Sequence, residues 1–171
     1  MKHIFYIIVL VLTFTSCQEQ AKIGYVDNST LINEIQEKKD LETKIKGKQD
    51  TFNKKRDSIS QAYSLDAQAT ELKLSKLSRQ KQQEGSVEFQ KKWGLVNQQM
   101  QFEEQQLTQL YQSEIDSLIN KVKGFVKDYG KTNGYTYILG TSDGASSVLY
   151  GTDENNLTQI ILEAIDAEYK K

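Results

Sequence analysis

The sequence contains no proline, and few glycines interrupt its central part. Only Gly47, Gly85 and Gly94 lie between residues 28 and 123. Because proline and glycine are poor helix formers, their scarcity predicts long helices, which we place at residues 28–130. That stretch is rich in Lys, Glu, Gln, Leu and Ile, and it has too few apolar side chains to form a globular core of its own.

Long apolar runs are also missing, apart from residues 4–14 at the start of the chain. One basic side chain, this apolar run and two small residues before Cys17 are typical of a secretory signal peptide, which we place at residues 1–16. The run is too short to span a bilayer. Small residues directly before a cysteine resemble a bacterial lipobox, so we predict that Cys17 is lipidated, with a chance free thiol as the alternative. Residues 17–21 would then be a lipidated spacer, and the protein an exported, membrane-anchored bacterial lipoprotein.

Reactive side chains are nearly absent from the mature chain. Removal of residues 1–16 removes His3, the only histidine, and leaves Cys17 as the only cysteine. This excludes Cys–His nucleophiles, zinc sites and thiol redox chemistry, and no glycine-rich phosphate loop is present. Of 22 basic residues Lys2 is also lost, which leaves 21 basic against 23 acidic side chains, a net charge of −2. We therefore predict a protein that is not an enzyme, holds no cofactor or metal, and does not bind nucleic acid.

Both ends of the chain carry β-prone segments. Residues 22–27 predict one strand, and residues 135–139 and 147–150 predict a β-hairpin around the turn-forming residues 142–145. Residues 153–155 are expected to cap a final helix whose apolar residues share one face.

The expected fold class is therefore α+β and mostly helical. A small body is built from residues 22–27 and 131–171, and a long antiparallel helical hairpin, the arm, is inserted between them at residues 28–130. The tip of the arm is expected near residues 75–86, with Gly85 as a plausible helix breaker. Because so small a body has little core of its own, we expect it to associate with further copies through its strands.

Charge is unevenly distributed along the arm. Residues 38–56 are mainly basic, whereas residues 103–116 contain acidic side chains and no Lys or Arg. If the hairpin turns near residue 82, these two stretches face each other, and their charges would set how the two halves of the arm pair. The alternative is a positive surface that attracts acidic clients or anionic lipid. Near the tip, basic side chains exceed acidic ones.

These features occur in the order that is found in a known family. The strand at residues 22–27, the Lys/Gln/Glu-rich hairpin, the β-prone segments 135–139 and 148–150 and the closing helix 157–165 together resemble the Skp (OmpH-like) family of periplasmic chaperones. The resemblance implies a homotrimer in which strands from three subunits form the body and three helical arms surround a cavity. It also implies that unfolded outer-membrane proteins are held there without nucleotide hydrolysis. The lipobox and the slightly acidic net charge differ from the best-known members.

The resemblance also suggests roles for individual residues. The candidates for the oligomer interface are Ile23, Tyr25, Tyr135, Tyr137, Val148 and Tyr150. The candidates for client contact are Phe89, Trp93, Met100, Lys73, Lys76, Arg79 and Lys81. For the first three of these, packing between the two halves of the arm is the favoured alternative.

A competing interpretation is a structural lipoprotein, in which a trimeric coiled coil serves as a spacer or adaptor of the cell envelope without chaperone activity. The predicted anchor favours it. The apolar seam along the arm is thin and interrupted, whereas a coiled-coil strut should carry continuous apolar positions.

Overall fold

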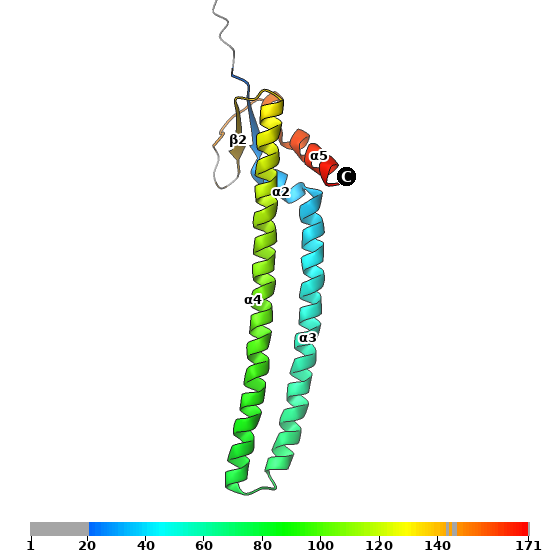
Figure 1. Ribbon diagram of the computed structural model, residues 1–171, viewed down its shortest axis with the longest axis vertical. Coiled ribbons are helices and arrows are strands. Elements are labelled where there is room, and N and C mark those ends of the chain that lie inside the picture. The colour runs from blue at the N-terminus through cyan, green and yellow to red at the C-terminus, as the bar shows by residue number, and fades with distance from the viewer. Residues whose placement is uncertain (1–20, 143, 145–146, 171) are drawn as a thin grey trace, which may run out of the picture.

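The structure is a computed structural model that describes residues 21–142, 144 and 147–170, so the predicted signal peptide and Cys17 lie outside the described residues. The elements in chain order are β1 (Ile23–Asp27), α2 (Asn28–Glu34), α3 (Gln36–Leu74), α4 (Arg79–Thr132), β2 (Tyr137–Thr141), a 3-10 turn η1 (Asp153–Asn155) and α5 (Thr158–Tyr169). Helices α3 and α4 form a long hairpin that projects from a small body made by the other elements and the top of α4 (Figure 1). The predicted α+β class, with a helical hairpin inserted into a body built from both chain ends, is confirmed.

The sheet of the body consists of two parallel strands. Ile23 of β1 pairs with Tyr137 of β2, and Tyr25 pairs with Leu139. Because side chains alternate between the two faces of a strand, these four residues share one face, while Val26 points to the other face and is buried in the core.

The predicted hairpin between residues 135–139 and 147–150 is wrong. Strand β2 pairs with β1, and residues 147–150 form no strand. The second edge of β1 is taken by the chain just before α5, where the Leu157 N–H donates to the Tyr25 carbonyl oxygen over 2.8 Å. Both β2 and the segment before α5 thus lie beside β1, and residues 147–150 lie in the connection between them.

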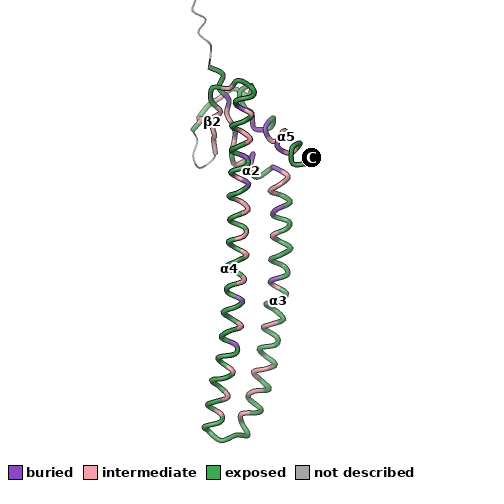
Figure 2. The backbone as a smooth tube through the Cα atoms, viewed as in Figure 1, coloured by how far each residue is buried: buried purple, intermediate pink, exposed green. Residues whose placement is uncertain are grey.

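The core of the body joins segments from both ends of the chain with the upper part of α4. Its fully or almost fully buried members are Val26, Leu31, Ile35, Leu118, Val122, Leu157, Ile161 and Ile165. Buried residues are concentrated in the body and become sparse along the arm (Figure 2). The arm therefore gains little from apolar burial, as its composition predicts.

The side chain of Asp27 caps the start of the helical region. The Asp27 carboxylate accepts hydrogen bonds from the Thr30 and Ser29 N–H groups over 3.0 Å and 2.9 Å. These bonds lower the pKa of the Asp27 carboxyl group, and the bond from the Thr30 N–H has the largest effect. The helix that follows is not continuous with the arm, however, because the backbone is extended at the fully buried Ile35 and α3 begins only at Gln36.

The arm turns at residues 75–78, inside the predicted interval but not at its predicted breaker. Gly85 lies within α4, where an added Cβ would collide with the side chain of Leu74. Glycine is thus suited to this position because it lets the end of α3 approach α4 closely.

The cap of the final helix also differs from the prediction. Residues 153–155 form the separate turn η1, and the side chain of Asn156 accepts the Thr158 N–H over 3.0 Å at the start of α5. The Thr158 hydroxyl in turn accepts the Asp27 N–H over 2.9 Å, which ties α5 to the end of β1.

Candidate functional site: the distal arm and the open face of the sheet

Ion pairs across the arm fix the register of its two helices. The pairs that join α3 to α4 are Glu37–Lys121 (2.6 Å), Lys44–Glu114 (3.3 Å), Lys55–Glu103 (2.6 Å) and Asp66–Lys92 (2.8 Å). The residue number rises on α3 as it falls on α4, so the helices run antiparallel. The two residue numbers of each pair have the same sum, so the register does not shift along the arm. The predicted opposition of a basic stretch on α3 and an acidic one on α4 is confirmed, although the turn comes a few residues before residue 82.

These pairs are partly or largely exposed, and pairs of this kind contribute little to stability. The ion pairs do lower the pKa of two of the carboxyl groups, those of Glu103 and Asp66. The hydrogen bond from Lys55, followed by that from Gln99, lowers the pKa of Glu103. The hydrogen bond from Lys92, followed by that from Trp93, lowers the pKa of Asp66.

Aromatic side chains hold the two helices together in the distal half of the arm. Trp93 is buried there, and its ring meets that of Tyr63 edge-on at 5.1 Å between centroids. Its indole N–H donates to Asp66 over 2.8 Å, and Phe89 lies 5.5 Å from Tyr63. Met100 is buried further along the arm. Phe89, Trp93 and Met100, three of the candidates for client contact, thus pack in the arm itself. This agrees with the alternative favoured for them above, packing between the two halves of the arm.

Other apolar side chains of the distal arm face outward, and sequence analysis missed them. They are 53% to 69% exposed, namely Leu65, Leu72, Val87, Leu95 and Phe102. Leu65 and Leu72 lie seven residues apart and share one face of α3, and Leu95 and Phe102 share one face of α4 in the same way. The sequence does contain this seven-residue spacing, at positions outside the row of apolar residues that joins the two helices.

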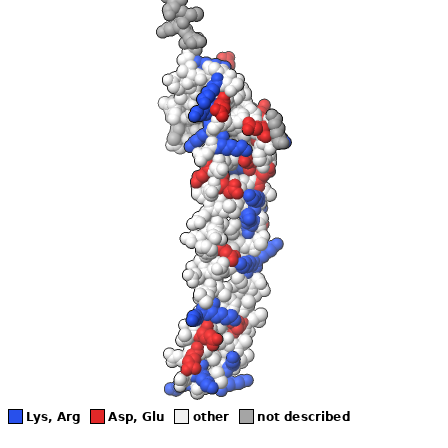
Figure 3. Space-filling view, in the orientation of Figure 1, with Lys and Arg blue, Asp and Glu red and all other residues white. Residues whose placement is uncertain are grey.

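The four basic candidates for client contact lie at the tip. Lys73, Lys76, Arg79 and Lys81 are all exposed, and none forms an ion pair within the described part of the chain. Basic atoms are visible at the free end of the arm in the space-filling view (Figure 3). The tip therefore combines uncompensated positive charge with the nearby exposed Leu72 and Leu77.

The open face of the sheet carries further exposed apolar groups. Ile23, Tyr137 and Leu139 are exposed there, and Tyr150 is exposed on the segment that follows β2. Of the remaining candidates for the oligomer interface, Tyr25, Tyr135 and Val148 are half-buried. Tyr135 stacks on Tyr129 with ring centroids 6.2 Å apart, and Lys22 lies over its ring at 4.1 Å.

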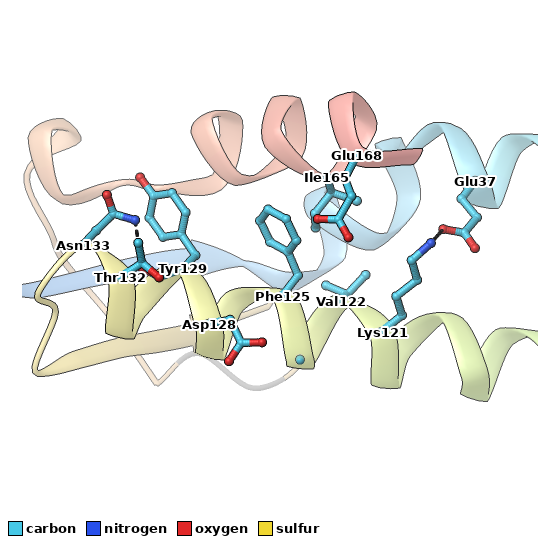
Figure 4. A pocket seen from close by; sticks show the side chains of 11 residues that line it. Glu37, Lys121, Val122, Phe125, Asp128, Tyr129, Thr132, Asn133, Ile165 and Glu168 are labelled. Carbon is cyan, nitrogen blue, oxygen red and sulfur yellow. Dashed lines mark hydrogen bonds and ion pairs between the residues drawn. The ribbon is translucent and has the colours of Figure 1, made fainter. Parts of the chain in front are cut away.

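Two open cavities flank the upper part of α4. One, of about 560 Å³, lies between α2, β2 and α4, and Lys123, Lys127 and Lys131 lie along it. The other, of about 440 Å³, lies between α4 and α5, with Phe125 and Tyr129 pointing into it (Figure 4).

Within the described residues, no group of His, Cys, Asp and Glu side chains is arranged to hold a metal ion. In the same part of the chain, no helix has both the length and the apolar character that are needed to cross a membrane.

Comparison with known proteins finds one matching family and several similar solved structures. The model of a family described as outer membrane protein (OmpH-like) matches residues 22–165. No curated protein matches the chain. A crystal structure from Caulobacter crescentus CB15, described as an outer membrane chaperone (OmpH-like), is similar with a TM-score of 0.73 and 12% sequence identity over 86% of this chain and 85% of that chain. At this identity the likeness shows a shared fold.

Proposed function

Because this chain belongs to the OmpH-like family of outer membrane proteins, we propose that it is an ATP-independent chaperone of the periplasm. It binds unfolded outer-membrane proteins along its helical arms and prevents their aggregation. Binding of this kind requires neither a closed pocket nor a reactive side chain, which fits a mature chain without histidine.

The observation that carries the proposal is the set of outward-facing apolar side chains on the distal arm. In the single chain Leu65, Leu72 and Leu95 are exposed to solvent, where apolar segments of an unfolded client can contact them. Spread along helices, they offer an unfolded chain several weak contacts in place of one tight site. Several weak contacts give strong overall retention, and each can still be released without ATP.

The basic tip adds an electrostatic contribution. Lys73, Lys76, Arg79 and Lys81 attract acidic segments of a client, and the long alkyl parts of the lysine side chains also contact apolar groups. Phe89, Trp93 and Met100 act indirectly in this proposal, because they keep the two helices of the arm together.

The active form in this proposal is a homotrimer whose three arms surround the client. Support comes from the open face of the sheet, where Ile23, Tyr137 and Leu139 expose apolar surface beside the outer edge of β2. Within the described residues β2 pairs only with β1, so its other edge is available to a strand of a second copy. The half-buried Tyr25, Tyr135 and Val148 and the exposed Tyr150 complete this interface.

A mass measurement tests the assembly. Light scattering of the chain from Gln18 onward should give three times the mass of one chain. Replacement of Tyr137 and Leu139 by serine should lower it to that of one chain, because both side chains face away from the core of the body. A wild-type mass of one chain would contradict the trimer.

The anchor is tested separately. Labelling of cells with a radioactive fatty acid should mark the wild-type protein and leave the Cys17→Ala variant unmarked. Equal labelling of both would rule out lipidation at Cys17.

The chaperone activity is tested by aggregation. An unfolded β-barrel protein diluted from denaturant should stay dispersed when the chain from Gln18 onward is present in a few-fold excess without ATP. Light scattering that rises as fast as in its absence would favour the alternative, a trimeric coiled-coil lipoprotein that serves as an envelope spacer.

A further inference from the structure

The two helices of the arm are attached to the body in different ways. Helix α4 runs without a break from the tip into the body, whereas α3 is separated from α2 by the extended backbone at Ile35, with φ −61° and ψ 138°. Ile35 is fully buried, so this break is a fixed part of the core. The connection through α3 is therefore interrupted by one non-helical residue, whereas the connection through α4 is a continuous helix.

Helix α4 has a weak point of its own at the same level. The ion pair between Glu37 and Lys121 places the start of α3 beside residues 121–124 of α4. Gly124 lies there, and glycine in a helix interior favours bending. No atom would obstruct a Cβ at this position, so packing does not require glycine.

Space for movement lies next to this glycine. The open cavity of about 440 Å³ between α4 and α5 is lined by Gly124 itself together with Phe125 and Ile165 (Figure 4). The close-up shows the two helices apart at this level, with Phe125 projecting between them. A bend of α4 toward α5 would move Phe125 further into this cavity.

The C-terminal part of α5 bridges both weak points by polar contacts. The Asp166 carboxylate accepts the Gln36 N–H over 2.9 Å, which caps the first turn of α3 from another helix. The Tyr169 hydroxyl donates to Asp40 over 3.1 Å, one turn further along α3. Lys121 of α4 lies 5.5 Å from the Tyr169 ring.

These contacts differ in kind from those that hold the base of α5. Ile161 and Ile165 are buried in the core, whereas Asp166 is half-buried and residues 167–170 are exposed. The polar contacts can therefore break while the apolar half of α5 stays in place.

We propose that the arm has a hinge at the level of Ile35 and Gly124, and that Asp166 and Tyr169 of α5 form a latch that holds it in one orientation. With the latch closed, the arm is attached at two points and is stiff. With the latch open, α3 is joined to the body only through Ile35, and α4 bends at Gly124. The use of this hinge, adjustment of the arm to clients of different size, rests on the proposed function, but the hinge itself can be tested without a client.

The test measures bending across Gly124 in the full chain with Cys17 replaced by serine. Spin labels at positions 105 and 131, both exposed on α4, lie on opposite sides of the hinge and should be separated by about 39 Å in a straight helix. Dilution with unlabelled chain removes distances between copies. The closed latch of the unmodified sequence should give a narrow distribution at this distance.

The variants separate the latch from a simple helix cap. Asp166→Ala should broaden the distribution toward shorter distances, and Asp166→Asn, which keeps an acceptor for the Gln36 N–H, should restore the narrow one. Tyr169→Phe, which leaves the cap intact, should broaden it as well. Addition of Gly124→Ala to Asp166→Ala should narrow it again by stiffening α4.

An unchanged distribution in Asp166→Ala, with faster hydrogen exchange in residues 36–40, would overturn the proposal, because the carboxylate would then be a cap and nothing more. If Asp166→Ala fails to fold, as judged by circular dichroism, Tyr169→Phe decides, and an unchanged distribution there overturns the latch. Loss of chaperone activity in the aggregation assay would bear on the proposed function alone, since no client is present in the distance measurement.

Discussion

Replacement of the outward-facing apolar residues of the distal arm should weaken client binding and leave the fold intact. The variant carries glutamine at Leu65, Leu72, Leu95 and Phe102. Full burial of a Leu or Phe side chain is worth about 1.5–3 kcal/mol. Since 53% to 69% of each residue is exposed, each offers a client roughly two-thirds of that value, about 1–2 kcal/mol.

The effect on affinity follows from this value. Even if a client covers only one of the four side chains at a time, their loss should raise the Kd about 5- to 30-fold. The arm itself should remain folded, because surface substitutions usually change stability by no more than about 0.5 kcal/mol and glutamine is a good helix former. Fluorescence anisotropy of a labelled, unfolded β-barrel protein measures the Kd, and circular dichroism measures the helix content.

A matched control is available on the same helices. Gln61 and Gln68 on α3 and Gln98 and Gln105 on α4 are exposed and have the same seven-residue spacing. Their replacement by alanine should leave the Kd within about twofold of the wild type, because no apolar surface of comparable size is lost. A Kd of the glutamine variant equal to that of this control would refute the reasoning.

Three further predictions concern the structure that presents these side chains. Ile161→Ala should lower the free energy of unfolding by about 2–5 kcal/mol in urea titrations followed by circular dichroism, since the side chain is fully buried in the body; a change below 1 kcal/mol would contradict the assigned core. Asp27→Ala should destabilise by about 1 kcal/mol in the same titration, whereas Asp27→Asn, which keeps a cap acceptor, should be close to the wild type. Because Lys92 lowers the pKa of Asp66, this carboxylate stabilises the arm above the pKa of a free aspartate, about 3.9, and the contribution is lost as the pH falls through the lower folded value. The fluorescence of Trp93, the only tryptophan, should therefore shift to the red in this acid range and not in Asp66→Asn, in which the carboxylate is absent; an identical acid shift in both proteins would exclude Asp66 as its cause.

The sequence was sufficient for features that depend on composition and on pattern along the chain. The absence of proline and the scarcity of glycine predicted the arm, and the basic and acidic stretches predicted which parts of α3 and α4 face each other. These features are local or repeat many times, so single errors do not alter them.

The features that the sequence could not supply depend on tertiary packing. Gly85 looked like a helix breaker, but it lies inside α4 because Leu74 needs the space beside it. Residues 147–150 have the β propensity of a strand, but β2 pairs with β1 from the other end of the chain and not with them. The helix is interrupted at Ile35 although no proline or glycine lies there. The interruption occurs where the Ile35 side chain is buried in the core.

The same limit applies to the candidate site. Trp93 and Met100 were predicted as candidates for client contact because they are large apolar residues in a polar arm. The same size lets them fill the space between the two helices. Leu65 and Leu95 stand out only once the register of α3 and α4 is known, because exposure on a hairpin depends on which face the other helix covers.

Site-specific photo-crosslinking tests most directly whether the distal arm holds the client. A benzophenone amino acid at position 72 or 95 should form crosslinks to an unfolded β-barrel protein, in a yield that saturates as the client concentration rises. The same probe at position 163, which is exposed on α5 of the body, should give little or no product. Equal crosslinking at all three positions, or crosslinking at position 163 alone, would contradict binding along the arms.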